Sequence, residues 1–306
     1  MGTPDFAVTI LRTLIENNHH IVGVITAPDK PSGRGRKLNE SAVKKYAKSQ
    51  GLLVLQPANL KKEVFLSELK ELHADLQIVV AFRILPKVVW NMPKMGTFNL
   101  HASLLPNYRG AAPIHWAIMN GEHKTGVTTF FIDDKIDTGA IILQKEIHIK
   151  NDETTGQLHD RLMYLGADLV LNTVRLIAKG NVMIIKQPKT EVKTAPKLYP
   201  GDCKIDWNDT LSNVYNKIRG LDPFPTAWTT LKNGKDHILT KIYTIEKVEE
   251  PHDLIPGKII SYGKELRVAV KNGFIRIIEI KLSGKKKMNS ISLLNGFSFD
   301  RNAMMC

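Results

Sequence analysis

The strongest constraint on the fold is an alternation of short apolar runs with amphipathic helical segments through the first 180 residues. The apolar runs, which are typical of buried strands, cover residues 21–26, 52–56, 76–82, 97–104, 126–132 and 141–149. Helical spacing of apolar side chains occurs at residues 7–18, 41–49, 61–72, 111–119 and 155–179. This alternation predicts an open α/β fold with a mostly parallel sheet, whose ligand sites lie beyond the carboxyl ends of the strands.

The pattern changes near residue 186. Residues 186–204 are polar, contain prolines and lack apolar periodicity, which is typical of a linker. One helix (209–219) and five short strands with glycine turns follow. We therefore expect a first domain at 1–185, a linker at 186–204 and a small β-barrel domain at 205–306. An oligonucleotide-binding (OB-like) barrel and a barrel with only a structural role both fit this pattern.

Composition excludes several classes of protein. The 306 residues are 43% hydrophobic and 24% charged, as in ordinary globular proteins. No apolar run approaches the roughly 18 residues of a membrane-spanning helix, and the N-terminus lacks a secretory signal pattern. Cys203 and Cys306 are too few for a disulfide framework, and the histidines lack metal-ligand spacing. We expect a cytoplasmic protein with reduced thiols, no membrane insertion and no metal.

The chain carries a formal net charge of +13, spread over both halves. Such a surface favours polyanions such as nucleic acid, although a lysine-rich proteome would give the same charge without any partner. Within the first half, cations gather at residues 27–37, a segment with two prolines and two glycines. We expect a basic loop there.

The densest candidate chemistry lies at residues 96–118. Asn99 and His101 are two residues apart on a predicted strand, so both side chains point to the same face. An amide and an imidazole that converge on one point suit the stabilisation of a developing oxyanion. The pair also fits ordinary packing or hydrogen bonding within a strand.

A carboxylate could complete this group. Asp133, Asp134 and Asp137 follow the predicted strand at 126–132, and one of them could fix the tautomer of His101 and raise its pKa. The same aspartates could simply cap a turn. The chain has no glycine-rich loop of the ATP- or NAD-binding type, so that chemistry is not indicated.

Several motifs together resemble methionyl-tRNA formyltransferases over nearly the whole chain. They are MGTPDFAV, PSGRGRKL, FNLHASLLPNYRGAAPI and IDTGAII in the first half, and CKIDW, KIRGLDPFPTAW, PGKII and GKKKM in the second. The resemblance implies a Rossmann-like formyltransferase domain followed by an OB-like tRNA-binding domain. It also implies formyl transfer from 10-formyltetrahydrofolate to the free α-amino group of methionyl initiator tRNA, for translation initiation, by a chain that we expect to be monomeric.

The resemblance also assigns residues to roles. The catalytic trio is Asn99, His101 and Asp137, the segment that contacts folate is Ser103, Leu104, Leu105 and Pro106, and the tRNA-binding loop holds Arg34, Arg36 and Lys37. In PFPTAW, Phe224 and Trp228 favour packing between the helix and the barrel over a base-stacking role.

The sequence departs from the family pattern at two places. The family has an apolar strand before GTPDF, so we expect translation to start upstream of Met1. The stretch AFRILP (81–86) is one residue shorter than the commoner AYGxILP, and its Arg83 would lie near the folate. Two rival functions stay open: a formyltransferase for a small amine, and a non-catalytic RNA-binding module. Neither rival explains both the intact trio and the second domain with its basic loop.

Overall fold

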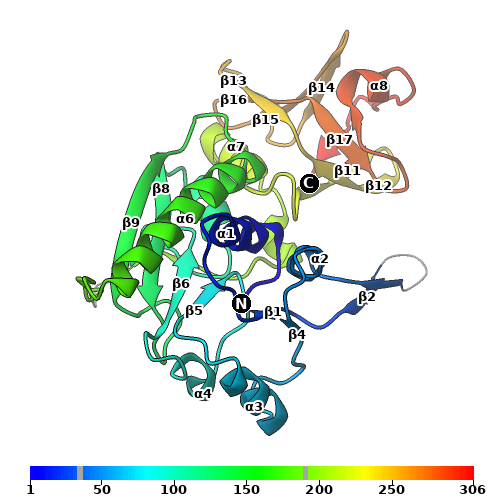
Figure 1. The fold of residues 1–306 in the computed structure, drawn as a ribbon. Coiled ribbons are helices and arrows are strands. Elements are labelled where there is room, and N and C mark those ends of the chain that lie inside the picture. Colours follow the sequence, from blue (N-terminus) through cyan, green and yellow to red (C-terminus); the bar gives the residue numbers. More distant parts are fainter. Residues whose placement is uncertain (33–36, 189–191) are drawn as a thin grey trace. The chain divides into compact units, whose positions relative to one another are not determined.

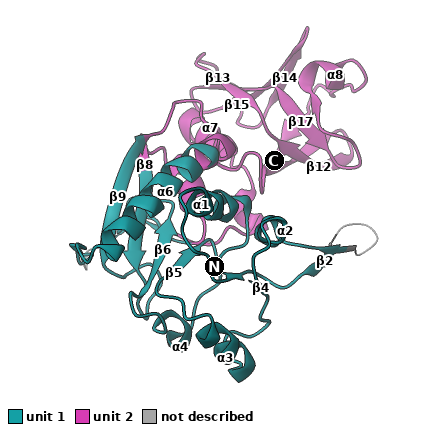
Figure 2. Ribbon diagram, in the orientation of Figure 1, with its two compact units in different colours: residues 1–110, 126–147, 160–194 teal, residues 111–125, 148–159, 195–306 magenta. Residues whose placement is uncertain are grey.

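The computed structural model describes residues 1–32, 37–188 and 192–306, which form two compact units (Figure 2). The first unit comprises residues 1–110, 126–147 and 160–194, and the second comprises 111–125, 148–159 and 195–306. The expected boundaries at 185 and 205 stay predictions, because compactness groups segments by contact whereas a domain is defined by independent folding.

The helices and strands follow the predicted alternation (Figure 1). Residues 1–110 contain α1 (Asp5–Glu16), β1 (Val24–Ile25), β2 (Lys30–Ser32), β3 (Lys37–Asn39), α2 (Ala42–Ser49), β4 (Val54–Leu55), α3 (Glu63–Glu71), β5 (Gln77–Val80), α4 (Lys87–Trp90), β6 (Thr97–His101) and β7 (Arg109–Gly110). Residues 111–204 contain α5 (Pro113–Met119), β8 (Lys124–Phe131), β9 (Ile141–His148), α6 (Thr155–Ala178), β10 (Thr194–Ala195) and a 3₁₀ helix (Pro200–Cys203). Residues 205–306 contain α7 (Leu211–Gly220), β11 (Ala227–Asn233), β12 (Asp236–Ile242), β13 (Ile245–Val248), β14 (Ile259–Tyr262), β15 (Glu265–Val270), β16 (Gly273–Ile277), β17 (Glu279–Leu282), β18 (Met288–Asn289), α8 (Ser290–Leu294) and β19 (Met304–Met305).

The main sheet of the first unit has the order β5-β6-β8-β9 and is mixed. Strands β5 and β6 pair in parallel, as do β1 and β4, but β6 and β8 are antiparallel. The prediction of a mostly parallel sheet is therefore wrong for residues 97–132. The physical reason is that α5, the helix between β6 and β8 in sequence, packs against α7 in the second unit. A parallel pair needs a crossover connection whose helix belongs with the sheet, whereas α5 is grouped with the other unit.

Helix α6 covers one face of this sheet. Thr173 and Thr129 of β8 share a hydrogen bond of 2.8 Å between their hydroxyl oxygens. Gly166 lies so close to the sheet that a Cβ there would approach Leu100 Cδ2 to 2.8 Å. A glycine is thus required for this helix to pack against β6, the strand that carries Asn99 and His101.

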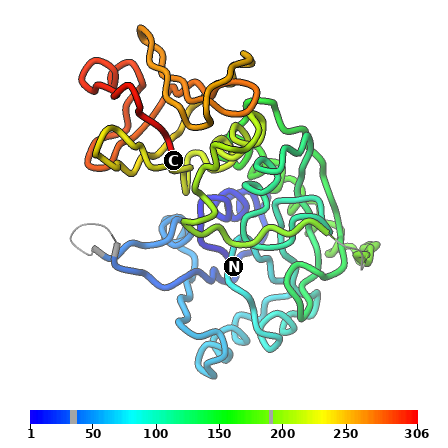
Figure 3. The backbone as a smooth tube through the Cα atoms, turned by 180° about the vertical axis from the view of Figure 1, so that it is seen from behind, coloured from blue at the N-terminus to red at the C-terminus, as the bar shows by residue number. Residues whose placement is uncertain are grey.

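The N-terminus is part of the sheet region of the first unit (Figures 1 and 3). The backbone N–H of Gly2 donates to Ile25 O at 3.0 Å, and that of Val80 donates to Met1 O at 2.9 Å. Met1 and Gly2 therefore bridge β1 and β5, where a further strand would pair with both. The expectation of an upstream start stays a prediction.

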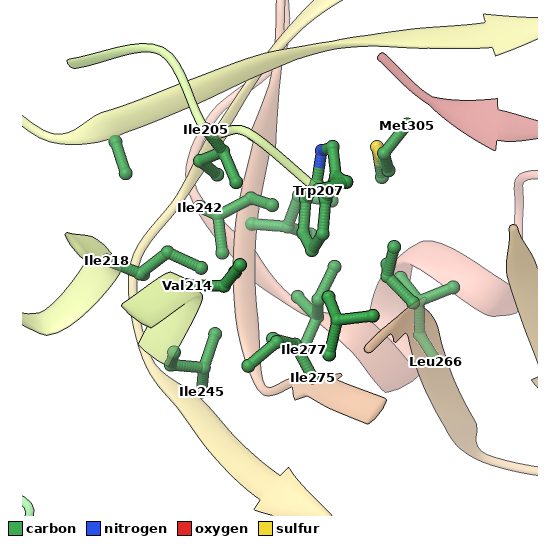
Figure 4. Close-up of a cluster of buried hydrophobic side chains, with 14 of the residues drawn as sticks. Ile205, Trp207, Val214, Ile218, Ile242, Ile245, Leu266, Ile275, Ile277 and Met305 are labelled. Carbon is green, nitrogen blue, oxygen red and sulfur yellow. The ribbon is translucent and has the colours of Figure 1, made fainter. Parts of the chain in front are cut away.

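The second unit contains two antiparallel sheets around one apolar core (Figure 4). The five-stranded sheet has the order β18-β17-β12-β11-β19, and the four-stranded sheet has the order β13-β16-β15-β14. Helix α7 is capped at its N-terminus by Thr210, whose hydroxyl accepts the N–H of Asn213, and it buries Val214 and Ile218 in this core. Burial of each such aliphatic side chain contributes roughly 1.5–3 kcal/mol. The two sheets are separate in the described residues and do not close into one barrel.

The PFPTAW segment differs from its prediction. Trp228 packs on the core and its indole N–H donates to Pro200 O at 2.7 Å, as expected of a packing residue. The side chain of Phe224, in contrast, is 78% exposed. The prediction that Phe224 packs between helix and barrel is wrong, because the loop 222–226 turns this ring away from the core.

Among the described residues, every helix is too short or too polar to span a lipid bilayer.

Candidate active site

Asn99 and His101 lie on β6, flanked by β5 on one side and β8 on the other. Asn99 is opposite Val79 in β5 and Phe130 in β8. Its side chain is partly exposed, and its amide makes no hydrogen bond to any residue that the structure describes. Alternation along the strand puts His101 on the same face, where it is 6% exposed. Asn99 therefore presents a free amide donor beside a buried imidazole.

Two protein groups face the nitrogens of the His101 ring. Nε2 lies 2.8 Å from the carbonyl oxygen of Tyr108, and Nδ1 lies 3.8 Å from Oδ2 of Asp137. A carbonyl oxygen only accepts, so Nε2 carries a hydrogen and donates it to Tyr108. This leaves Nδ1 as the ring nitrogen that faces Asp137. The expectation that a carboxylate fixes the tautomer is therefore corrected: the Tyr108 carbonyl fixes it, and Asp137 faces Nδ1.

Asp137 is held in place by its backbone and by Gly110. Its φ of +54° is in the left-handed region, and its Oδ2 accepts the backbone N–H of Gly110 at 2.9 Å. Gly139, two residues later, passes so close to β8 that a Cβ there would lie 1.6 Å from Phe131 O. The loop 132–139 can thus turn back only with glycine at this point.

The three candidate aspartates have different roles in this loop. Asp133 accepts the hydroxyl of Thr138 at 2.7 Å and the backbone N–H of Lys135 at 3.1 Å, so it caps the turn. Asp134 is exposed. Asp137 is the carboxylate that faces His101. The turn-capping interpretation therefore applies to Asp133, and the interpretation as a carboxylate partner of His101 applies to Asp137.

Gln187 fixes the Asp137 loop and was not found by sequence reasoning. Its side-chain N–H groups donate to Asp137 O at 3.0 Å and to Gly139 O at 2.8 Å. Its Oε1 accepts two hydrogen bonds from the guanidinium of Arg109, at 2.6 and 3.1 Å. Gln187 lies in the segment interpreted as a linker, where no periodicity marked it.

The SLLP segment follows β6 directly, and its polar groups are used within the protein. Ser103 is fully buried and its hydroxyl donates to Asn107 O at 2.7 Å. The backbone N–H of Leu105 donates to the Thr128 hydroxyl at 3.2 Å, and Gln144 donates to Leu105 O at 2.8 Å. Leu104 and Pro106 are partly exposed. These two are the members whose side chains can touch a ligand.

Comparison with known proteins identifies the family to which this sequence and fold belong. The formyl transferase family model matches residues 1–174, and the formyl transferase C-terminal domain model matches residues 197–298. A methionyl-tRNA formyltransferase of Flavobacterium johnsoniae is 59% identical over 99% of this chain and 96% of its own length. One of Bacteroides fragilis is 51% identical over 97% of this chain and 94% of its own length. The chain belongs to the methionyl-tRNA formyltransferase family.

Solved structures support the fold of this formyltransferase. An N-formyltransferase from Helicobacter canadensis, in complex with folinic acid and dTDP-3-aminofucose, has a TM-score of 0.65 and 22% identity. The match covers 90% of this chain and 96% of that one. A sugar 3N-formyltransferase crystallised with dTDP and 5-N-formyl-THF has a TM-score of 0.67 and 20% identity, and covers 93% of this chain and 97% of that one. At such identities the likeness shows the fold alone.

A cavity of about 660 Å³ lies beyond the carboxyl end of β5 in this formyltransferase. Its described lining is apolar and basic: Ala58, Asn59, Leu60, Lys61, Arg83, Ile84, Leu85, Pro86, Lys87 and Val88. The Arg83 guanidinium donates to the carbonyls of Pro57 and Ala58, but its Nε is buried without a partner. Burial lowers the pKa of Arg83. The cavity residues 83–88 follow β5 directly. Because β5 and β6 are parallel neighbours, these residues begin at the same edge of the sheet as His101 at the end of β6.

The predicted tRNA-binding loop is only partly described. Arg34 and Arg36 lie outside the described residues, and Lys37 opens β3, which pairs with β2. Nearby cations are neutralised: Lys44 pairs with Asp29, and Lys48 pairs with Glu40 at 2.6 Å. The hydrogen bond from Lys44 lowers the pKa of Asp29. The positive charge of this stretch therefore depends on Lys30 and the loop itself more than on α2.

The structure groups no three His, Cys, Asp or Glu side chains in a metal-binding arrangement within residues 1–32, 37–188 and 192–306.

Proposed function

We propose that this chain transfers the formyl group of 10-formyltetrahydrofolate to the free α-amino group of methionine on initiator tRNA. The observation that carries the proposal is the arrangement on β6. There Asn99 offers an unpartnered amide, and His101 is oriented by Tyr108 O so that Nδ1 faces Asp137. Identity above 50% with methionyl-tRNA formyltransferases over nearly the full chain supports the choice of donor and acceptor.

The trio acts on the charge that develops at the formyl oxygen. As the amine nitrogen bonds to the formyl carbon, that oxygen becomes an oxyanion. The Asn99 amide and a protonated Nδ1–H of His101 donate to it, while Asp137 balances the positive charge of the imidazolium. Donors that are already oriented need no reorganisation during the reaction, and removal of one costs roughly 3–4 kcal/mol.

The proton moves in the opposite direction to the formyl group. The amine must lose a proton to attack, and Asp137 accepts it, directly or through a water molecule. The bond between the formyl carbon and N10 of the folate then breaks, Nδ1–H of His101 gives its proton to that nitrogen, and Asp137 passes the proton that it holds to Nδ1. The hydrogen bond from Nε2–H to Tyr108 O persists throughout, so Nδ1 is the ring nitrogen that changes its protonation.

The donor occupies the carboxyl ends of β5 and β6 in this proposal. Leu104 and Pro106 contact it through their exposed parts, whereas Ser103 and Leu105 support the segment from within. The apolar and cationic cavity at Lys61, Arg83 and Lys87 suits an aromatic group that ends in carboxylates, which is the chemistry of the benzoylglutamate half of a folate.

The tRNA is bound by positive charge in both halves of the chain. Arg34, Arg36 and Lys37 approach the acceptor end, and the two sheets of the second unit, as the OB-like part of the fold, contact the rest of the tRNA. We place the reaction in the cytoplasm, at translation initiation, and propose that the chain acts as a monomer.

One assay separates this function from its rivals. The purified protein is mixed with 10-formyltetrahydrofolate and either methionyl-tRNA or a small amine such as glycinamide ribonucleotide or an amino sugar nucleotide. Formylation of methionyl-tRNA alone supports the proposal. Formylation of a small amine alone would assign the trio to another acceptor. Binding of tRNA without formyl transfer would favour the RNA-binding module.

A further inference from the structure

The loop 222–226 in the second unit displays one aromatic ring to solvent from a firmly anchored backbone. The side chain of Phe224 is 78% exposed, while Leu221, just before the loop, and Thr226, its last residue, are buried. Single exposed apolar residues are common on protein surfaces. What distinguishes Phe224 is the number of contacts that hold the backbone around it.

Groups from several parts of the second unit hydrogen-bond to this loop. Nε2 of His115 lies 3.0 Å from Phe224 O, and the backbone N–H of Gly156 donates to Asp222 O at 3.1 Å. The hydroxyl of Thr226 donates to Pro223 O at 2.8 Å, and its backbone N–H donates to Leu221 O at 2.9 Å. The loop therefore has little freedom to fold the ring back onto the protein.

The charges around the ring suit an anionic partner. The ammonium of Lys241 donates to Pro225 O at 3.4 Å and has no carboxylate partner among the described residues. Asp222 is half-buried, and burial raises its pKa. Burial likewise lowers the pKa of His115, which keeps its imidazole neutral near pH 7 and donating to Phe224 O. A cation without a carboxylate partner among the described residues thus contacts the backbone of the loop that carries the exposed aromatic ring.

We propose that Phe224 stacks against an unpaired base at the 3′ acceptor end of the tRNA, with Lys241 next to the adjoining phosphate. Aromatic side chains combined with positive charge on the same surface are the usual means of binding single-stranded nucleic acid. Only unpaired nucleotides expose a base face for stacking, and the acceptor end is the unpaired segment that carries the reacting methionine. This inference rests on the proposed function and adds a residue that positions the acceptor.

The test measures binding of uncharged initiator tRNA, either intact or lacking its last three nucleotides. Phe224→Ala and Phe224→Leu are compared with Phe224→Tyr, which keeps a ring. Tyr164→Ala is the control, since Tyr164 is a 65% exposed aromatic residue on α6 of the first unit and is not part of the proposed tRNA surface. We expect Phe224→Ala and Phe224→Leu to weaken binding of intact tRNA roughly 5- to 100-fold, the range of one base–aromatic stack. Phe224→Tyr and Tyr164→Ala should bind it like the wild type.

The truncated tRNA locates the contact. It should bind wild type and Phe224→Ala equally, because the nucleotides that stack are missing. Equal loss of affinity for both tRNAs, or no loss for either, would overturn the inference. A wild type that fails to formylate methionyl-tRNA would contradict the proposed function instead, so the two failures are distinguishable.

Discussion

The imidazole of His101 donates through Nε2 to the carbonyl oxygen of Tyr108, seven residues later in the chain, at 2.8 Å. The residues between them form the SLLPN turn, whose Ser103 hydroxyl bonds to Asn107 O. The same segment that shapes the proposed folate surface therefore also orients the ring. Because Nε2 is occupied, Nδ1 beside Asp137 is the nitrogen that we expect to act on the substrate.

Gln187 is expected to position Asp137 without touching substrate. Gln187→Glu keeps the acceptor for Arg109 but loses both donors to the carbonyls of Asp137 and Gly139. Since misplacement of a catalytic group by about 1 Å can cost around 100-fold, we expect kcat to fall at least tenfold. KM for both substrates should change less than threefold. Steady-state kinetics check this, with the exposed Gln50→Ala as control; a lower kcat in Gln50→Ala, or an unchanged one in Gln187→Glu, would refute the role.

The cavity at Arg83 gives a separate prediction for the donor. Replacement of Lys61 and Lys87 by Ala removes two cations from its lining. We expect KM for 10-formyltetrahydrofolate to rise roughly tenfold, since each charge-assisted contact to a carboxylate contributes about 1.5–3 kcal/mol when buried and less when exposed. KM for methionyl-tRNA should stay unchanged. If the tRNA KM rises instead, the cavity does not serve the donor.

The basic loop should act on tRNA through charge alone. Arg34→Ala with Arg36→Ala removes two cations, so the slope of log affinity against log salt should flatten by roughly two. KM for the folate should not change. Lys45→Ala provides a single-charge comparison on neighbouring α2. Measurement of tRNA binding between low and physiological salt checks this, and an unchanged slope would remove the loop from the tRNA interface.

Local sequence patterns predicted where helices and strands lie better than they predicted which of them pack or pair with one another. Apolar spacing located α1 and α6 to within a few residues, because periodicity reports which face is buried. It could not show that α5 packs on α7, so β6 and β8 were expected to be parallel. Nor could it separate a packed Trp228 from an exposed Phe224, since both lie in one aromatic and proline-rich segment.

In the candidate site, too, local spacing predicted some residues, whereas others depend on tertiary contacts. Spacing two apart on a strand was enough to pair Asn99 with His101. The identity of the carboxylate depended on a turn in which Asp137 alone adopts a left-handed backbone and faces the ring. Gln187 and the carbonyl of Tyr108 were not found, because their roles come from long-range contacts and a main-chain atom that leave no pattern in the sequence.

Single-turnover formyl transfer to methionyl-tRNA by Asn99→Ala and His101→Ala tests the central claim most directly. At saturating 10-formyltetrahydrofolate, each variant should lose 10²- to 10³-fold or more in rate, the usual cost of one oxyanion donor, while its affinity for tRNA stays within twofold of wild type. A near-normal rate for either variant, with tRNA bound as tightly as before, would contradict the assignment of that residue to the chemistry.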